Sequence, residues 1–378
     1  VKVVNGHSIA GIARGGRQWP RSVDTQSGLA AVGSFGGSPV VLALEDLRVL
    51  SDGGPDTHGP NAVAVAGEDV LIGLDSGSVV TVPIASLRLG VGDGARRHDV
   101  SNSPILSIAG APGGWLAGSY SGQVLRVADN PRPALLGSVT LSAPVASLAC
   151  SPRGDRAAAG TYNGNLVRLG FTDRGLETIA DLPLHHGSIK SLAWTTDSSV
   201  ISGATDGAVR SSDDLGESVE LWRHGNLINA VAVDARGFVA SASRDRRIQL
   251  GRVNGRRVGH LWNLLGPDES IKAVSLIGRG NDLCIVGGSY DFAVYVWRVD
   301  LDAEPSADLR SGTVVHEFAQ AVSTSCMIDE RQMIVASWDG NVALFEIDDE
   351  RGAPKCRSIV AIRDVVDSAE NTQIVMPQ

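Results

Sequence analysis

The chain has 378 residues, 43% of them hydrophobic and 20% charged, and a formal net charge of −9 at pH 7. No apolar run reaches the roughly 18 residues of a membrane-spanning helix, so we expect no membrane partner. Phosphate contacts demand a basic surface, and the acidic balance therefore argues against nucleic acid as a partner. The four cysteines lack metal-type spacing and three lie in apolar strand patterns, which favours reduced thiols and a cytoplasmic location.

A short apolar strand, a tight turn and a second apolar strand recur eight times along the chain. The turns span residues 33–37, 73–77, 118–122, 160–164, 203–207, 242–246, 288–292 and 336–340. Their last residues lie 39 to 48 residues apart, and this period is typical of a radial β array. Six turns end in glycine, which adopts positive φ without strain. Arg246 and Phe292 end the other two, so we expect strained backbone or another turn type there.

The apolar runs around the turns are β-branched-rich, four to eight residues long and bounded by Gly, Asn, Asp and Pro, which predicts strands. One unit shows the full pattern, with strands expected at 189–194, at 200–203, after Gly207 and near 219–222. The inner strands lack clean apolar–polar alternation, so both sheet faces should be covered. These features predict an all-β fold, a β-propeller of four-stranded antiparallel blades. We predict eight blades, with seven as the alternative if the first or second unit is an extra hairpin.

Two segments are candidates for the strand that closes the ring. Val1–Val4, followed by Asn-Gly-His, has the order expected of a fourth strand leading into a first, and we favour it over Ser358–Ile362. We expect a single propeller over residues 1–363 and a C-terminal tail over 364–378 that is poorly ordered or links to another segment. The acidic stretch 300–308 is predicted to be an exposed loop. The start at valine favours a domain of a longer protein.

Several spacings within the units match a known repeat. An Asp stands six residues before an aromatic at Asp291–Trp297 and again at Asp339–Phe345. A His stands 21 residues before an Asp in two further units, at His185–Asp206 and His224–Asp245. With Gly-His near the start and a serine-rich second strand, the units resemble divergent WD40 repeats over nearly the whole chain.

The resemblance implies that His, Ser or Thr, Asp and Trp form a hydrogen-bonded network that stiffens each blade. No single repeat of this chain has all four members in their expected places. Ser76 and Ser121 stand where the second and third repeats should have the Asp, which puts their networks in doubt. A blade-network role for His185 is therefore favoured over metal binding by the adjacent pair His185–His186.

The resemblance also implies a noncatalytic platform for proteins or peptides, without a cofactor. The residue just before the Asp-like position varies between turns: Phe35, Asp75, Tyr120, Tyr162, Thr205, Arg244, Tyr290 and Trp338. Five of these eight are aromatic, although the chain has only 6 Phe, 4 Tyr and 7 Trp. Corresponding turns emerge at one end of a propeller, so we predict an aromatic-lined mouth that binds a protein or peptide segment. The alternative is that these rings only pack on the loops of neighbouring blades.

The turn Arg244-Asp-Arg-Arg247 is the most basic, and Arg96-Arg-His98 lies in a connection that approaches the same end. An arginine here could bind a carboxylate or phosphate of a partner. The alternative is a solvated turn that pairs with acidic residues of the preceding unit, namely Asp213, Asp214 or Glu217.

Two other functions remain open at this point. One is an enzyme with its active site in the central channel; the other is a nucleic-acid sensor that uses Arg96, Arg97, Arg244, Arg246 and Arg247. The sequence has no phosphate-binding loop with its lysine, no His-Glu-x-x-His and no nucleophile elbow. We therefore favour a recognition scaffold, with partners that include other domains of the same full-length protein.

Overall fold

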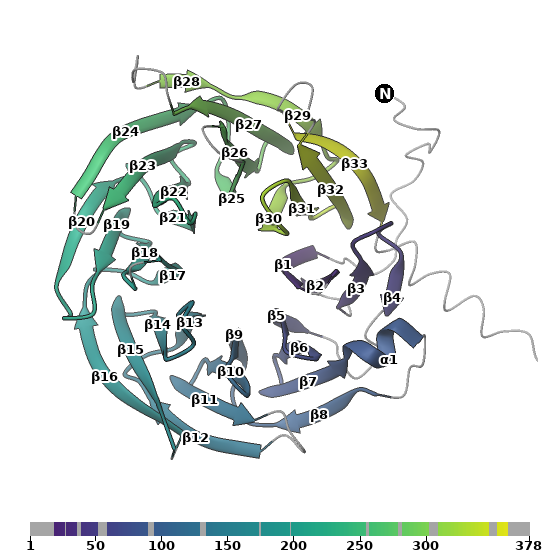
Figure 1. Ribbon diagram of the computed structural model, residues 1–378, viewed down its shortest axis with the longest axis vertical. Helices are drawn as coiled ribbons and strands as arrows, with labels where there is room; N and C mark the ends of the chain where they lie inside the picture. The colour runs from purple at the N-terminus through teal and green to yellow at the C-terminus, as the bar shows by residue number, and fades with distance from the viewer. Residues whose placement is uncertain are drawn as a thin grey trace, which may run out of the picture.

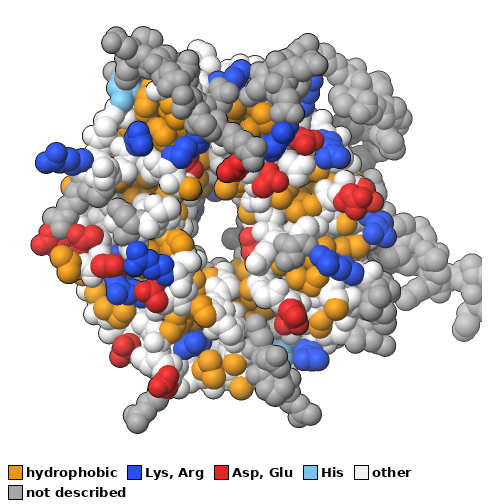
Figure 2. Space-filling view, in the orientation of Figure 1, with side chains coloured by type: hydrophobic (Ala, Val, Ile, Leu, Met, Phe, Trp, Pro, Cys, Tyr) orange, Lys and Arg blue, Asp and Glu red, His pale blue; other side chains and the backbone are white. Residues whose placement is uncertain are grey.

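In the computed structural model the chain forms a closed ring of eight β-sheets (Figure 1). The structure describes residues 19–26, 28–35, 39–51, 59–89, 94–128, 134–173, 175–196, 198–254, 257–278, 282–301, 309–347 and 354–361. Each sheet is a blade whose four strands, here called a to d, follow one another from the centre to the rim. Figure 2 shows the ring hollowed at its centre, with charges of both signs interspersed on that face. The eight-bladed antiparallel propeller is confirmed, and the seven-blade alternative is wrong.

Blades 1 to 4 occupy the first half of the chain. Blade 1 has β1 (Trp19–Gln26), β2 (Leu29–Phe35), β3 (Val40–Ala43) and β4 (Val49–Ser51). Blade 2 has β5 (Pro60–Ala66), β6 (Asp69–Leu74), β7 (Ser78–Pro83) and β8 (Arg96–Asp99), with the short α1 (Ile84–Leu89) between its last two strands. Blade 3 has β9 (Ile105–Ala111), β10 (Gly114–Ser119), β11 (Gln123–Ala128) and β12 (Ala134–Thr140). Blade 4 has β13 (Val145–Cys150), β14 (Arg156–Thr161), β15 (Asn165–Thr172) and β16 (Gly175–Pro183).

Blades 5 to 8 complete the ring. Blade 5 has β17 (Ile189–Trp194), β18 (Val200–Ala204), β19 (Ala208–Ser212) and β20 (Ser218–Arg223), close to the strands expected from the sequence. Blade 6 has β21 (Ile228–Val233), β22 (Phe238–Ser243), β23 (Ile248–Asn254) and β24 (Arg257–Leu265). Blade 7 has β25 (Ile271–Ile277), β26 (Asp282–Ser289), β27 (Ala293–Asp300) and β29 (Thr313–Glu317). Blade 8 has β30 (Val322–Met327), β31 (Gln332–Ser337), β32 (Asn341–Ile347) and β33 (Pro354–Ala361).

One strand crosses between blades. β28 (Leu309–Ser311) comes from the connection between the c and d strands of blade 7, and it pairs in parallel with β24 at the rim of blade 6. Blade 6 therefore has a fifth strand supplied by its neighbour.

The hydrophobic core lies in the seams between blades rather than at one centre. Eight clusters of buried side chains are found among the described residues, and each joins two neighbouring blades. A sheet can bury both of its faces only by packing on one neighbour at each face. This explains why the inner strands lack apolar–polar alternation.

The ring closes without exchange of a strand between its ends. The d strand of blade 8 is β33, from the C-terminal part of the chain, so the expected closure by Val1–Val4 is wrong. Blade 1 meets blade 8 through an apolar cluster that includes Leu42 and Leu344, and Thr25 Oγ1 donates to the Met327 carbonyl at 3.0 Å. Residues 1–18, most of the acidic stretch 300–308 and the tail 364–378 lie outside the described residues.

The turns between strands b and c share one geometry. In seven of them the last turn residue donates its amide to the carbonyl three residues earlier, as in Gly207 to Ala204 at 3.2 Å, and has positive φ. Arg246 and Phe292 adopt φ values of 71° and 77° in the same geometry. The expected backbone strain at these two positions is confirmed, since positive φ costs a non-glycine residue about 1 kcal/mol or more.

Replacing the strained residue should therefore stabilise the fold. We expect Arg246→Gly to raise the free energy of unfolding by about 1 kcal/mol. The reverse change at an equivalent turn, Gly207→Ala, should lower it, because φ there is 80° and a Cβ would lie 2.8 Å from the His224 carbonyl oxygen. Urea denaturation of the two variants measures both effects, and a destabilised Arg246→Gly variant would contradict the interpretation of strain.

Candidate functional site

The b–c turns of blades 2 to 8 emerge at one end of the ring, which we call the b–c face. There the residue before the Asp-like position donates its amide to a carbonyl just ahead of strand a of its own blade. Seven such bonds of 2.8–3.0 Å are present: Asp75 to Gly59, Tyr120 to Pro104, Tyr162 to Pro144, Thr205 to Ser188, Arg244 to Leu227, Tyr290 to Ser270 and Trp338 to Ala321. These seven turn positions, aligned by sequence, therefore make the same backbone hydrogen bond, and they differ only in their side chains. Phe35 ends β2, and its side chain lies outside the description.

Tyr120 and Tyr162 form the first aromatic pair on this face. Their ring centroids lie 6.1 Å apart at an interplanar angle of 87°, an edge-to-face contact between blades 3 and 4. Tyr120 remains 53% exposed and Tyr162 45% exposed. The neighbouring groups are neutral, for example Asn163, whose amide nitrogen donates to Ser142 Oγ at 3.1 Å.

Tyr290 and Trp338 form the second pair, between blades 7 and 8. Their centroids lie 5.0 Å apart at 48°, and both side chains are half-buried. Lys272 Nζ lies 5.2 Å from the Tyr290 centroid, within the range of a cation–π contact. Burial raises the pKa of Tyr290, and the nearby Arg244 guanidinium partly counters that rise.

The four described aromatic side chains thus form two pairs. Blades 3 and 4 lie across the channel from blades 7 and 8 (Figure 1). Thr205 and Arg244 separate the two pairs on one side of the ring, and Asp75 lies between them on the other side. Each ring packs on an aromatic ring of the neighbouring blade, yet the two tyrosines of blades 3 and 4 keep about half their surface open.

Among the described residues no ion pair joins the arginine-rich turn to Asp214. Asp214 instead pairs with Arg156 and Arg168 of blade 4, at 3.0 and 2.9 Å. Within its own turn, Arg247 Nε lies 4.0 Å from Asp245 Oδ2. The pairing of this turn with Asp214 is therefore wrong.

The basic stretch at 96–98 forms β8 at the rim of blade 2. Arg97 reaches the b–c turn of its own blade, where Nη2 donates to Ser76 Oγ at 3.2 Å, and its Nε lies 3.1 Å from Asp99 Oδ1. The expected connection is therefore a strand, whereas the approach of Arg97 to the b–c face is confirmed.

Blade 5 contains a hydrogen-bonded network of His185, Ser202 and Asp206. His185 Nδ1 lies 3.1 Å from Asp206 Oδ1, and Nε2 lies 2.8 Å from Ser202 Oγ. Burial lowers the pKa of His185, which favours the neutral ring. Burial alone would raise the pKa of Asp206, but the amides of His186 and Ala208 bind its carboxylate at 3.0 Å and help lower that pKa. The network holds the link between blades 4 and 5 on the b–c turn.

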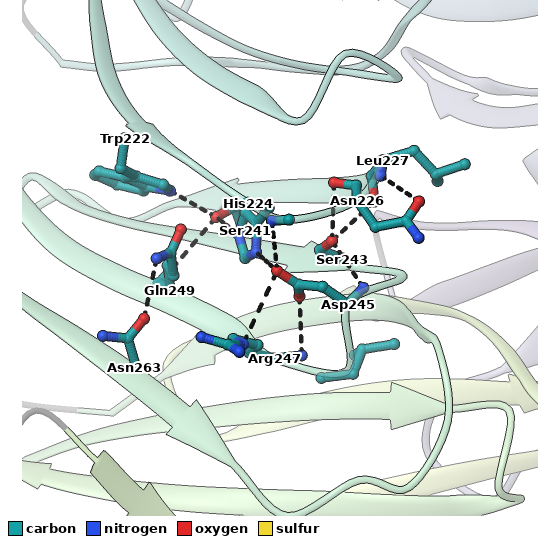
Figure 3. Close-up of polar contacts among 12 residues, drawn as sticks. Trp222, His224, Asn226, Leu227, Ser241, Ser243, Asp245, Arg247, Gln249 and Asn263 are labelled. Carbon is teal, nitrogen blue, oxygen red and sulfur yellow. Dashed lines mark hydrogen bonds and ion pairs between the residues drawn. The ribbon is translucent and has the colours of Figure 1, made fainter.

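Blade 6 has a complete set of four residues, shown in Figure 3. His224 Nδ1 lies 3.0 Å from Asp245 Oδ2, and its Nε2 lies 2.8 Å from Ser241 Oγ. The Trp is Trp222, which comes from the d strand of blade 5 and donates Nε1–H to Ser241 Oγ at 2.8 Å. Glycine occupies the c-strand position expected for Trp, and a Cβ on that Gly251 would lie 3.0 Å from the indole.

Sequence reasoning missed this substitution. The sequence does contain a signal for it. A glycine stands six residues after Asp245, where Trp is expected, and a Trp stands two residues before His224. The expectation that no repeat keeps all four members in their usual places holds, yet the four groups still meet in space.

The remaining blades use other polar groups at the same turn. In blade 7 Asp291 accepts from Tyr295 Oη at 2.9 Å, while Trp297 donates to the Leu265 carbonyl at 2.8 Å. In blade 3 Ser121 takes the Asp-like place and lies 2.9 Å from Ser119 Oγ. Hydroxyl pairs thus replace the His–Asp contact where the sequence put that contact in doubt.

The sequence profile of the WD40 family (WD domain, G-beta repeat) matches residues 176–211, the stretch that holds the blade 5 network. That match and the eight-bladed ring of four-stranded antiparallel sheets decide the family. The chain is a WD40-repeat propeller. WD40 propellers are in general noncatalytic scaffolds for protein interaction.

Solved structures similar to this WD40 propeller share its fold at low sequence identity. A computationally designed protein, Ika8, is 19% identical with a TM-score of 0.69, over 88% of this chain and 98% of that one. Sqt1 from Chaetomium thermophilum is 17% identical with a TM-score of 0.69, over 88% and 97%. The structure of U3-55K is 14% identical with a TM-score of 0.54, over 69% and 83%. A search of curated proteins found no match.

The opposite face of the WD40 propeller carries a shallow depression of about 430 Å³ over the a–b turns of blades 1 to 4. It is lined by small residues such as Ala66 and Gly110, together with Cys150 and Arg153. Burial raises the pKa of the Cys150 thiol to about 12, which makes it a poor nucleophile.

The described ranges contain no group of three His, Cys, Asp or Glu side chains arranged to hold a metal ion. No helix in those ranges has the length and apolar character to cross a membrane. All four cysteines are free thiols, and Cys284 is buried.

Proposed function

We propose that this WD40 propeller is a noncatalytic recognition scaffold that holds an extended segment of a partner protein across the mouth of the channel on its b–c face. The supporting observation is the placement of four aromatic side chains at equivalent turn positions. Tyr120 and Tyr162 are about half exposed there, while Tyr290 and Trp338 form a second pair on the opposite side of the channel. Rigid, amphipathic rings of this kind are frequent anchors in protein interfaces.

The backbone of the b–c face supports this role. The amide of each anchor is bonded to its own blade, and the histidine networks of blades 5 and 6 fix the neighbouring links. A preorganised surface loses little conformational entropy on binding. The proposed setting is a cytoplasmic protein in which this propeller serves as the sensing or scaffolding domain of a larger chain or complex.

Removing the four anchors tests the proposal. We expect the combined variant Tyr120→Ala, Tyr162→Ala, Tyr290→Ala and Trp338→Ala to lose partner binding by about a hundredfold or more, since two hot-spot aromatics at about 2 kcal/mol each suffice for that loss. The measurement compares the proteins that wild type and variant retain from extract of the native cell, followed by titration of one retained partner.

A matched control removes exposed apolar side chains from the opposite face. Leu215 lies in the c–d turn of blade 5 and Met327 at the a–b end of blade 8. The double variant Leu215→Ala and Met327→Ala should bind as the wild type does. Unchanged partner binding by the folded aromatic variant would refute the proposed function.

A further inference from the structure

We propose that the mouth on the b–c face binds an acidic segment of the partner, with a carboxylate side chain held at a cationic subsite. This subsite consists of Arg244, Lys272, Tyr290 and Trp338 on blades 6 to 8. The inference rests on the proposed function, because it assigns a chemistry to the segment that the mouth holds.

A β-bulge directs Lys272 to the mouth. In every blade the a–b pairing skips one residue of strand a close to the b–c face. Such a bulge leaves one residue unpaired and re-aims its side chain. In blades 2 to 8 the skipped residues are Asn61, Leu106, Ala146, Lys190, Asn229, Lys272 and Ser323. The cations among them lie on blades 5 and 7, on the same side of the ring as the arginine-rich turn.

The contacts of Lys272 fix its ammonium group between two blades. Nζ donates to Asn229 Oδ1 at 3.3 Å and lies 5.2 Å from the Tyr290 ring centroid. Asn229 is itself held, because its Nδ2 donates to the Ile271 carbonyl at 2.8 Å and to Ser270 Oγ at 3.1 Å. The positive charge is therefore placed beside the aromatic pair of blades 7 and 8.

Arg244 supplies the second charge. Its side chain is exposed, and no carboxylate of the described residues lies within 4.0 Å of its guanidinium. The Asp245 carboxylate of the same turn is taken by His224 and Arg247. Arg244 and Tyr290 occupy equivalent turn positions on the neighbouring blades 6 and 7, with their amides bonded to the Leu227 and Ser270 carbonyls. An arginine binds a carboxylate through two parallel hydrogen bonds, and a lysine adds a point charge.

The other side of the mouth is chemically different. Around Tyr120 and Tyr162 the turn and link residues are hydroxyl and amide side chains such as Ser121, Ser142 and Asn163. A segment that crosses the channel therefore meets a neutral aromatic pair on blades 3 and 4 and a cationic aromatic pair on blades 7 and 8. This asymmetry fixes the direction in which an acidic segment binds.

The charge near the subsite suits a single carboxylate better than a polyanion. The whole chain carries a net charge of −9. Asp268 and Glu269 are exposed in the link that precedes the strand of Lys272. These groups repel a nucleic acid backbone, whereas one carboxylate is balanced by Arg244 and Lys272 at short range.

Selection from a display library of short random peptides tests the inference on the full chain. Sequencing of the bound and unbound pools gives the enrichment of Asp and Glu over Asn and Gln. We expect about tenfold enrichment at one position, the effect of a charge-assisted hydrogen-bonded pair. The preference should shrink as salt is raised.

Two charge variants test whether the cationic subsite causes the acidic enrichment. Lys272→Gln and Arg244→Gln should each reduce the acidic enrichment severalfold while peptides with Asn or Gln still bind. Arg153→Gln, which removes the same charge from the opposite face, should leave the enrichment unchanged. Enrichment that persists in both subsite variants would overturn the inference.

The outcomes separate this inference from the proposed function. Peptides that depend on Tyr120 and Tyr162 but show no acidic enrichment would refute the cationic subsite and leave the recognition scaffold in place. Peptides that bind equally well without all four aromatic rings would refute both.

Discussion

Trp222→Ala should lower the free energy of unfolding by about 3–5 kcal/mol, the usual range for loss of a buried Trp. The indole is 6% exposed and belongs to the apolar cluster that joins blades 5 and 6. Its ring covers Gly251, where no side chain is present to fill the space that an alanine at 222 would leave. The large cost follows from a cavity in the seam between two blades.

A second change separates the cavity from the hydrogen bond. Trp222→Phe keeps most of the ring volume but removes the donor to Ser241, so we expect a loss of about 1–2 kcal/mol. Urea denaturation measures both variants. Equal losses in the two variants, or a loss below about 1 kcal/mol in the alanine variant, would show that the indole does not fill the seam.

The sequence predicted the architecture because the turns carry a local signal. Positive φ at the last turn residue selects glycine, which six of the eight turns have. The recurrence of that turn position every 39 to 48 residues predicts the number of blades. Even the two exceptions, Arg246 and Phe292, were recognisable as strained. Turn chemistry depends on a few adjacent residues, so a single sequence suffices to read it.

The closure of the ring was predicted wrongly because strand pairing is not local. The segments 1–4 and 358–362 have similar apolar patterns, and composition gives no means of ranking them. In the structure Ile359 pairs with Ala343, in a register that continues the meander of blade 8. The choice between the two ends depends on contacts across the whole ring.

The candidate site was predicted in part. Aligning the turns found the positions of Tyr120, Tyr162, Tyr290 and Trp338, but the grouping into pairs depends on distances between blades. The bulge residue Lys272 was not singled out, because a bulge in strand a shows in the pairing register and leaves no mark in composition. Similarly, Trp222 replaces a residue of the next blade, and the sequence marks this only by the glycine at 251 where Trp is expected.

Asp214→Ala should lower the free energy of unfolding by about 2–3 kcal/mol, because it leaves the buried Arg168 guanidinium without its carboxylate partner. Arg168 is 1% exposed, and its Nη1 donates to Asp214 Oδ1 at 2.9 Å across the seam between blades 4 and 5. Burial lowers the pKa of Arg168, and the Asp214 carboxylate opposes that effect. Without the carboxylate, the buried guanidinium keeps only the Ser212 carbonyl as an acceptor among the described residues.

The double variant Arg168→Met and Asp214→Ala distinguishes a lost attraction from an uncompensated charge. Methionine fills similar volume without a charge, so the double variant should recover most of the stability lost in Asp214→Ala. Arg168→Met alone should cost about 1 kcal/mol or less, because Asp214 is partly exposed and still pairs with Arg156 at 3.0 Å. Urea denaturation gives the free energy of unfolding of all four proteins in this cycle. If the losses of the two single variants add up in the double variant, the stabilising effect of Asp214 does not depend on Arg168. Strong coupling would show instead that Asp214 stabilises the fold by neutralising the guanidinium buried in the neighbouring blade.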